Sequence, residues 1–181
     1  MSIMLIAVLG GIKSGKSRFA VSLAQADGSA VCVIATGLPV DAEMRQRIAS
    51  HRRSRPAGWM VLEEPLRPVA ALARAQNPHT ILLDAVDTWL ANRMEELGGS
   101  AARWTAGRKI RLERELATEL GDLVAAAPHV IAVSNEVGMA PVALSPYGRA
   151  FADLLGGLNQ RLFALARERY LMVAGVALRV G

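Results

Sequence analysis

The residues best suited to chemistry form a glycine-rich loop near the start of the chain. The P-loop pattern G-x-x-x-x-G-K-S/T is satisfied by Gly10-Gly11-Ile12-Lys13-Ser14-Gly15-Lys16-Ser17. In such a loop, backbone N–H groups surround the phosphates, the lysine reaches the β- and γ-phosphate oxygens, and the serine hydroxyl ligates Mg²⁺. Two of the three lysines of the chain lie here, which makes a chance match a poor explanation. The loop therefore predicts a site for a nucleoside triphosphate.

A P-loop also needs a carboxylate at the end of a neighbouring strand to hold the metal. Asp84 ends the apolar run 81–84, and Asp87 follows one helical turn later. Glu136, after a later apolar run, is a competing carboxylate, and Asp84 could instead cap a helix that begins at Val86. We assign the metal to Ser17 and Asp84.

A second candidate is a histidine at the end of a predicted helix, in the cationic run His51-Arg52-Arg53-Ser54-Arg55. Most such runs are solvated helix ends whose charge complements the helix dipole. If the run instead faces the P-loop, its arginines bind a nucleotide phosphate and disfavour the imidazolium form of His51. A neutral imidazole attacks an α-phosphate, displaces pyrophosphate and forms a nucleotidyl-histidine. Both interpretations stay open at this point.

The elements that must position these residues follow from the hydrophobic pattern. Short apolar runs without alternation predict strands that are buried on both faces, over residues 3–9, 30–35, 80–84, 129–134 and 170–176. Helical spacing predicts helices over residues 17–24, 41–55, 110–127 and 149–167. Strands that alternate with helices indicate right-handed βαβ crossovers. We therefore expect an α/β fold, with a mostly parallel sheet covered by helices on both faces.

Two details refine this expectation. The helix over residues 41–55 starts at Asp41, which suits an N-cap, and carries Met44, Ile48 and His51 on one face. Residues 98–107 form the loosest stretch, and residues 141–146 are predicted to be a surface loop. Neither stretch divides the chain, so we expect a single nucleotide-binding domain over residues 1–181.

The cysteine content and the apolar runs bear on where in the cell the protein works. Cys32 is the only cysteine and lies in an apolar run, so a disulfide within the chain is excluded and we interpret this residue as core. The first nine residues lack a basic leader and a cleavage site, which indicates a strand rather than a signal peptide. No apolar run approaches the ~18 residues that span a bilayer. We expect a cytoplasmic protein without a membrane span.

Charge and histidine placement are less informative. The net charge is +5, and all but three of the 21 basic residues are arginine. This excess suits phosphate binding, nucleic acid or a compositional bias, but no basic stripe with interleaved aromatic residues supports a nucleic-acid partner. His79 and His129 each precede an apolar run and are interpreted as ordinary residues at strand starts. The sequence contains no cluster of histidine and cysteine residues with metal-ligand spacing.

Together the residues resemble one family, the bifunctional adenosylcobinamide kinase and adenosylcobinamide-phosphate guanylyltransferase of cobalamin biosynthesis. The resemblance spans almost the whole chain. It rests on Gly10–Arg18, Ile34-Ala35-Thr36, Asp41-x-Glu43-Met44, Arg47-Ile48-x-x-His51-Arg52-x-x-Arg55-Pro56-x-x-Trp59, Glu63-Glu64-Pro65, Leu83-Asp84, Ser134-Asn135-Glu136-Val137-Gly138-Met139, Asn159-Gln160 and Ala174-Gly175. One departure is Ala140-Pro141-Val142-Ala143, where the family commonly has Gly-Ile-Val-Pro.

The resemblance implies a RecA-like P-loop fold and two activities. ATP or GTP phosphorylates the aminopropanol hydroxyl of adenosylcobinamide. GTP then guanylylates His51, and GMP passes to the new phosphate to give adenosylcobinamide-GDP. The family is usually homotrimeric, so we expect a homo-oligomer.

The resemblance also implies site residues. His51 and Lys16 are catalytic, and Glu63 contacts the guanine or the ribose. The nucleotide-binding positions are Gly10, Gly11, Ile12, Lys13, Ser14, Gly15, Lys16, Ser17, Ala35, Thr36, Gly37, Arg52, Arg53, Ser54, Arg55, Glu63 and Asp84.

Two alternatives remain. One is a P-loop small-molecule kinase without guanylyl transfer, in which the cationic run clamps the transferred phosphoryl group. The other is a RecA-like NTPase that depends on nucleic acid, suggested only by the basic isoelectric point and by fold analogy.

Overall fold

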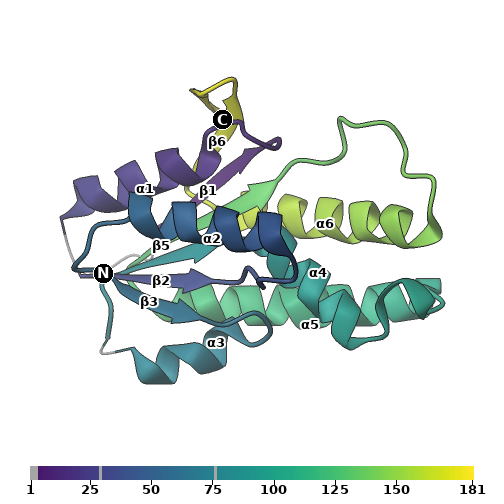
Figure 1. Ribbon diagram of the computed structural model, residues 1–181. Coiled ribbons are helices and arrows are strands. Elements are labelled where there is room, and N and C mark those ends of the chain that lie inside the picture. Colours follow the sequence, from purple (N-terminus) through teal and green to yellow (C-terminus); the bar gives the residue numbers. More distant parts are fainter. Residues whose placement is uncertain (1–3, 29, 76) are drawn as a thin grey trace.

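A computed structural model describes residues 4–28, 30–75 and 77–181 of the chain (Figure 1). Within them seven strands form one sheet in the order β3-β2-β4-β5-β1-β6-β7. The strands are β1 (Met4–Gly10), β2 (Val31–Ala35), β3 (Met60–Glu63), β4 (Thr80–Asp84), β5 (His129–Asn135), β6 (Glu168–Val173) and β7 (Val176–Arg179). All neighbouring strands are parallel except β6 and β7, which are antiparallel. The expected, mostly parallel sheet is confirmed.

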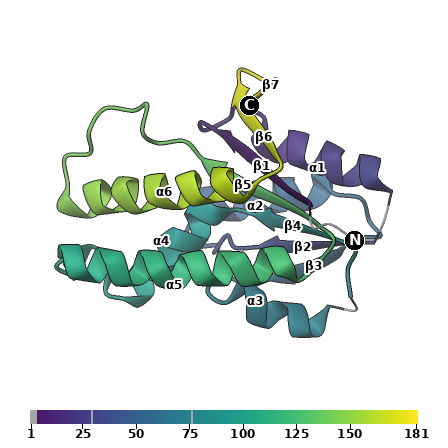
Figure 2. The same cartoon turned by 180° about the vertical axis from the view of Figure 1, so that it is seen from behind.

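The helices cover both faces of this sheet, as expected. They are α1 (Lys16–Asp27), α2 (Ala42–Ser54), α3 (Pro68–Ala71), α4 (Val86–Glu96), α5 (Ala106–Ala125) and α6 (Pro146–Leu165), with 3₁₀ turns η1 (Leu72–Arg74) and η2 (Gly99–Ala101). Figures 1 and 2 show α1 and α2 on one face and α4, α5 and α6 on the other. Among the helices described, none combines the length and apolar character that crossing a membrane requires.

The core is built mainly from aliphatic side chains, in two layers separated by the sheet. One layer packs α1 against Val33, Leu82 and Val133, and the other packs α4, α5 and α6 against residues such as Ile34 and Leu83. Cys32 is buried in β2, as expected. The helix predicted over residues 110–127 is present as α5, which buries four leucines, whereas Ile110 near its start is 47% exposed.

Two strands differ from the sequence-based expectation. The run predicted as one strand over residues 170–176 is broken, because Ala174 and Gly175 have φ values of 49° and 87° and turn the chain into β7. The edge strand β3 was not predicted, since it has only four residues and its Met60 and Val61 side chains are each 37% exposed. Both errors concern the sheet edges, where apolar burial is weakest.

The carboxyl ends of four strands meet at one edge of the sheet and position the site. Gly10 at the end of β1 pairs with Asn135 of β5, and Ala35 of β2 pairs with Asp84 of β4. The sequence suggested that Asp84 ends a strand directly beside the P-loop strand. This detail was wrong, because β5 lies between β1 and β4. This edge is where parallel α/β sheets bind their ligands.

Candidate active site

The P-loop connects β1 to α1 in a geometry that glycine makes possible. Gly15 has a φ of 95° as the N-cap of α1, a left-handed conformation that side chains disfavour. A Cβ atom on Gly10 would lie 2.5 Å from the Ser14 hydroxyl oxygen and 2.8 Å from the Met172 carbonyl oxygen, so only glycine fits between the loop and β6. The Lys16 Nζ atom donates to the Gly11 carbonyl oxygen at 3.1 Å. The amino end of α1 is therefore presented at the sheet edge.

A pocket of about 450 Å³ opens beside this loop. It is lined by residues of the loop, four strand ends, α2 and the start of α4: Ile12, Lys13, Ser14, Gly15, Lys16, Ser17, Arg18, Ala35, Gly37, Met44, Ile48, His51, Arg52, Arg55, Glu63, Asp84, Ala85, Asp87, Thr88 and Asn135. The structure thus brings the cationic run of α2 and the P-loop lysine to the same cavity. Met44, Ile48 and His51, which the helical spacing placed on one face of α2, all line this pocket.

The Asp84 carboxylate contacts both the P-loop and the cationic run at the end of α2. Its Oδ1 accepts a hydrogen bond from the Ser17 hydroxyl at 3.3 Å. Its Oδ2 accepts one from Arg55 Nη2 at 2.8 Å and lies 3.4 Å from His51 Nδ1. The alternative role as a helix cap is wrong, because the N-cap of α4 is Ala85. One carboxylate therefore faces the loop with one oxygen and the cationic run with the other.

The charge state of Asp84 follows from these contacts. Burial opposes ionisation of this side chain, which is 9% exposed, but the hydrogen bond from His51 and the positive charge of Arg55 outweigh it and hold the pKa of Asp84 below its ordinary value. An ionised carboxylate only accepts hydrogen bonds. His51 therefore donates from Nδ1, so in the neutral form of the ring the lone pair belongs to Nε2.

Helix α2 is held at the pocket by polar contacts rather than by the core. It begins where the Asp41 carboxylate accepts a hydrogen bond from the Met44 N–H at 2.7 Å, a favourable N-cap. None of its described side chains is buried. At its other end Arg55 pairs with Asp84, and Arg52 pairs with Glu63 at the end of β3. The position of α2 therefore depends on these ion pairs.

A second carboxylate, Asp87, lies on the pocket wall in the first turn of α4. It is 8% exposed and accepts a hydrogen bond from the Asn135 side-chain amide, while its Oδ1 has no hydrogen-bond partner among the described residues. Burial raises the pKa of Asp87, and the charge of Lys16 offsets only part of this effect. We noted Asp87 in the sequence but assigned it no role. Thr88 was missed, although its position one turn after Asp84 was a usable signal.

Several predicted positions lie outside the pocket lining. Gly10 and Gly11 belong to the loop but do not line the pocket, and Arg53 is exposed on α2 outside it. Thr36 is fully buried and donates to the Ala85 carbonyl oxygen at 2.8 Å, which fixes the β2 and β4 ends to each other. The Ser54 side chain lies outside the described part of the chain. The competing carboxylate Glu136 accepts from the Gly138 N–H and does not line the pocket.

The residues at the loop also fit a hard divalent cation. Ser17 Oγ and Asp84 Oδ1 lie 3.3 Å apart and offer two oxygen ligands beside the amino end of α1. Mg²⁺ prefers oxygen ligands of this kind and completes its shell with water and phosphate oxygens. The donor set is thus suited to a metal that accompanies a nucleotide.

Comparison with known proteins places these features in context. Residues 6–180 match the model of the cobinamide kinase / cobinamide phosphate guanyltransferase family. The bifunctional adenosylcobalamin biosynthesis protein CobU of Escherichia coli (strain K12) is 36% identical over 184 residues, covering 98% of this chain and 99% of that protein. The bifunctional adenosylcobalamin biosynthesis protein CobP of Pseudomonas aeruginosa is 39% identical over 170 residues, covering 93% and 92%.

Solved structures of low sequence identity share the fold. A prototypical ATPase from the type III secretion system of pathogenic bacteria superposes with a TM-score of 0.59 at 10% identity, covering 97% of this chain and 56% of that one. The ATP synthase subunit NeqB of Nanoarcheaum equitans superposes with a TM-score of 0.52 at 13% identity, covering 94% and 47%. The chain spans about half the length of these proteins. The expected RecA-like P-loop fold is confirmed.

Proposed function

The chain belongs to the cobinamide kinase / cobinamide phosphate guanyltransferase family, and we propose that the pocket beside the P-loop serves both reactions, with Lys16 and His51 as the catalytic residues. Membership makes the protein a bifunctional enzyme of cobalamin biosynthesis. The observation that carries the proposal is the position of Asp84. Its carboxylate contacts Ser17 of the P-loop and His51 of α2 at the same time.

The first reaction is phosphoryl transfer to the aminopropanol hydroxyl of adenosylcobinamide. The hydroxyl oxygen forms a bond to the γ-phosphorus, the bond from that phosphorus to the bridging oxygen breaks, and the nucleoside diphosphate leaves. The hydroxyl proton is released. Lys16 and the loop N–H groups stabilise the charge on the phosphate oxygens. This role suits Lys16, which lines the pocket at the amino end of α1.

The second reaction begins with guanylylation of the protein. His51 Nε2 forms a bond to the α-phosphorus of GTP, and pyrophosphate leaves with the electrons of the broken P–O bond. The imidazole becomes positively charged in this step. The Asp84 carboxylate, 3.4 Å from Nδ1, stabilises that charge and holds the ring in one tautomer, as carboxylates do beside catalytic histidines.

The product forms when GMP leaves the histidine. A phosphate oxygen of adenosylcobinamide phosphate attacks the same phosphorus, the P–N bond breaks, and His51 returns to its neutral form. The product is adenosylcobinamide-GDP. Arg52 and Arg55 follow His51 in the sequence and line the same pocket, and we assign them to bind phosphate oxygens in both steps.

The proposed nucleotides are GTP for guanylylation and ATP or GTP for phosphorylation, each with Mg²⁺. Ser17 and Asp84 would hold the metal, which neutralises charge on the phosphates when bound. We assign Glu63 to the guanine or the ribose, because its carboxylate lines the pocket and is 54% exposed. Ala35, which pairs with Glu63 in the sheet, and Gly37 also line the cavity.

We also propose a cytoplasmic homotrimer. Support for association comes from the loop that precedes α6, which carries largely exposed apolar side chains. Met139, Val142 and Leu144 are 81%, 80% and 97% exposed, and Figure 1 shows their loop projecting from the body of the fold. Such side chains mark association surfaces. Light scattering after gel filtration measures the mass of the assembly, and a monomer over a wide concentration range would contradict this part.

The experiment that tests the function compares two assays on one protein preparation. His51→Ala is expected to keep phosphorylation of adenosylcobinamide within about tenfold of wild type and to lose GMP transfer by at least about 1,000-fold, because only transfer uses the imidazole. Arg53→Ala, a few residues along α2 and outside the pocket, is the matched control. Loss of both activities, or retention of transfer, would contradict the assignment.

The two alternatives are less well supported. A kinase without guanylyl transfer would leave the second half of the family description without a counterpart. A nucleic-acid-dependent NTPase would show ATP hydrolysis that is stimulated by single-stranded DNA and that depends steeply on salt. The likeness to ATPase structures is limited to the fold.

A further inference from the structure

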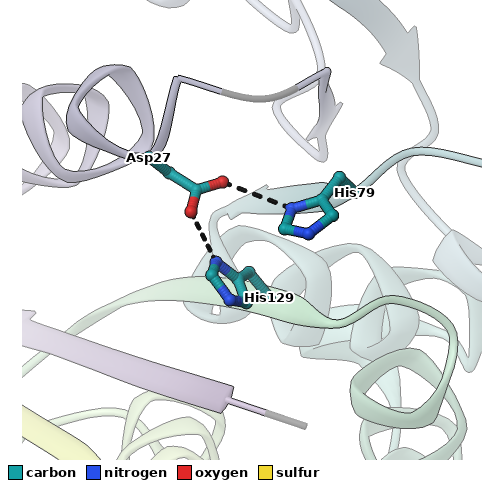
Figure 3. A group of neighbouring side chains, drawn as sticks. All are labelled: Asp27, His79 and His129. Atoms are coloured by element: carbon teal, nitrogen blue, oxygen red, sulfur yellow. Dashed lines mark ion pairs between the residues drawn. The ribbon is translucent and has the colours of Figure 1, made fainter. Parts of the chain in front are cut away.

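Three polar residues that are far apart in the sequence meet at the sheet edge opposite the pocket. Asp27 is the last residue of α1, His79 directly precedes β4, and His129 is the first residue of β5 (Figure 3). The His129 N–H donates to the His79 carbonyl oxygen at 3.1 Å, which sets the two histidines side by side. Chain spacing gave no sign of this cluster, and our interpretation of both histidines as ordinary residues at strand starts was incomplete.

Both imidazole rings turn the same nitrogen atom toward the carboxylate. His129 Nδ1 lies 2.7 Å from Asp27 Oδ1, and His79 Nδ1 lies 3.4 Å from Asp27 Oδ2. One ligand atom from each residue falls within 4.8 Å of the other two. In a tetrahedral site with bonds of about 2.1 Å, ligand atoms lie roughly 3.4 Å apart. The distance from His79 to the carboxylate matches that value, and the distance from His129 is about 0.7 Å shorter.

Hydrogen bonds between the described residues do not satisfy every buried polar atom of the cluster. His79 Nδ1 is buried and has no hydrogen-bond partner among the described residues, although it faces Asp27 at ion-pair distance. The buried Thr80 hydroxyl donates to Asp27 Oδ2 at 2.5 Å, which orients the carboxylate as outer-shell partners of metal ligands do. The side chains of His79 and His129 are 37% and 27% exposed, so an ion with bound water has access.

The donor types select the kind of ion. Two imidazole nitrogens and one carboxylate oxygen suit Zn²⁺ and its first-row neighbours, whereas Mg²⁺ prefers a shell of oxygen atoms. We propose that Asp27, His79 and His129 form a binding site for a divalent transition-metal ion of the zinc type, with open positions for water. The site is separate from the Ser17 and Asp84 pair, and the inference does not depend on the proposed function.

Binding would join three elements at their ends. The ion would link α1 to the starts of β4 and β5, two strands that pair directly. Because the cluster combines elements distant in sequence, the unfolded chain offers no comparable site, and binding stabilises the fold. If the cluster is only a hydrogen-bonded junction, added metal is not expected to stabilise the fold.

The test is a titration of the full chain, without a histidine tag, after removal of metals and in buffer free of Mg²⁺ and nucleotide. Co²⁺ is the probe, because bound Co²⁺ absorbs visible light, and Zn²⁺ then competes for the site. We expect one Co²⁺ per chain in wild type and a melting temperature raised by roughly 5–10 °C at a hundredfold excess of Zn²⁺ over Kd.

The variants His79→Gln and His129→Gln separate the two explanations. Glutamine still donates a hydrogen bond to Asp27 but is a poor ligand for zinc-type ions, so metal affinity is expected to fall by at least about 100-fold while metal-free melting changes little. His51→Ala removes the one histidine of the chain that lies outside the cluster. This variant is expected to bind Co²⁺ like wild type. Absence of binding in wild type, equal affinity in the glutamine variants, or loss of binding in His51→Ala would overturn the proposal.

Discussion

His51 Nδ1 lies 3.4 Å from Asp84 Oδ2, although 33 positions separate the two residues in the sequence. The contact forms because α2 ends over the carboxyl edge of the sheet, where β4 ends at Asp84. The other carboxylate oxygen faces Ser17 at 3.3 Å. A nucleotide on the P-loop therefore has the imidazole within the same pocket, and Asp84 connects the two.

Asp84→Asn is expected to lower both activities by at least about 100-fold, because an amide neither holds Mg²⁺ well nor stabilises a positive imidazole. Turnover numbers for phosphorylation and for GMP transfer, measured at saturating substrate, check this. The matched control is Glu136→Gln, which alters the carboxylate outside the pocket. A variant that loses transfer alone would show that Asp84 does not serve the P-loop side.

Arg55→Ala is expected to reduce the free energy of unfolding by about 3–5 kcal/mol, since the side chains of Arg55 and Asp84 are only 6% and 9% exposed and the change leaves a buried charge without its closest partner. Arg53→Ala, at an exposed position on α2, is expected to change it by less than about 0.5 kcal/mol. Urea unfolding measures both values. Equal effects would mean that the ion pair does not anchor α2.

Asp87→Asn is expected to raise stability at pH 7. Because the pKa of Asp87 is raised in the folded protein, ionisation costs the folded state, so this residue's contribution falls as pH rises from about 4 through the folded pKa. The gain from the substitution should therefore be present at neutral pH and disappear below about pH 4. Unfolding free energies across this range measure it, and a gain that persists in acid would contradict the assigned cause.

Gly10→Ala is expected to destabilise the protein by about 1–3 kcal/mol, because the added methyl group would meet the Met172 carbonyl oxygen at 2.8 Å. The comparison is Gly11→Ala, where an added Cβ atom meets nothing within 4 Å and stability should change little. Thermal melting of the two variants measures the difference. Similar losses of stability at both positions would mean that the conformation of the loop itself, rather than its packing against β6, causes the destabilisation.

The sequence was informative wherever one local pattern determines structure. The P-loop pattern, the Asp41 N-cap and the buried runs of β1, β2, β4 and β5 each depend on residues adjacent in the chain, and the structure has all of them. The edge strand β3 was not predicted because three of its four residues are exposed and its apolar residues do not alternate. The hairpin of β6 and β7 escaped because its apolar residues continue through the turn.

The site was harder to predict where distant residues meet. The sequence suggested that Lys16 and His51 meet at one nucleotide. It did not show that Asp84 would contact both Ser17, beside Lys16, and His51. Thr36 looked like a nucleotide contact and is instead buried between strand ends. The histidine cluster with Asp27 combines three elements, so its existence depends on strand order, which no spacing along the chain reveals.

The most direct measurement is covalent labelling by GTP. Protein incubated with Mg²⁺ and GTP carrying radioactive phosphorus at the α-position is expected to retain label that is stable to base and labile to acid, as a phosphoramidate is. Peptide mapping is expected to place the label on His51, and GTP labelled at the γ-position should leave none. Label at another residue, or undiminished label in His51→Ala, would contradict the account.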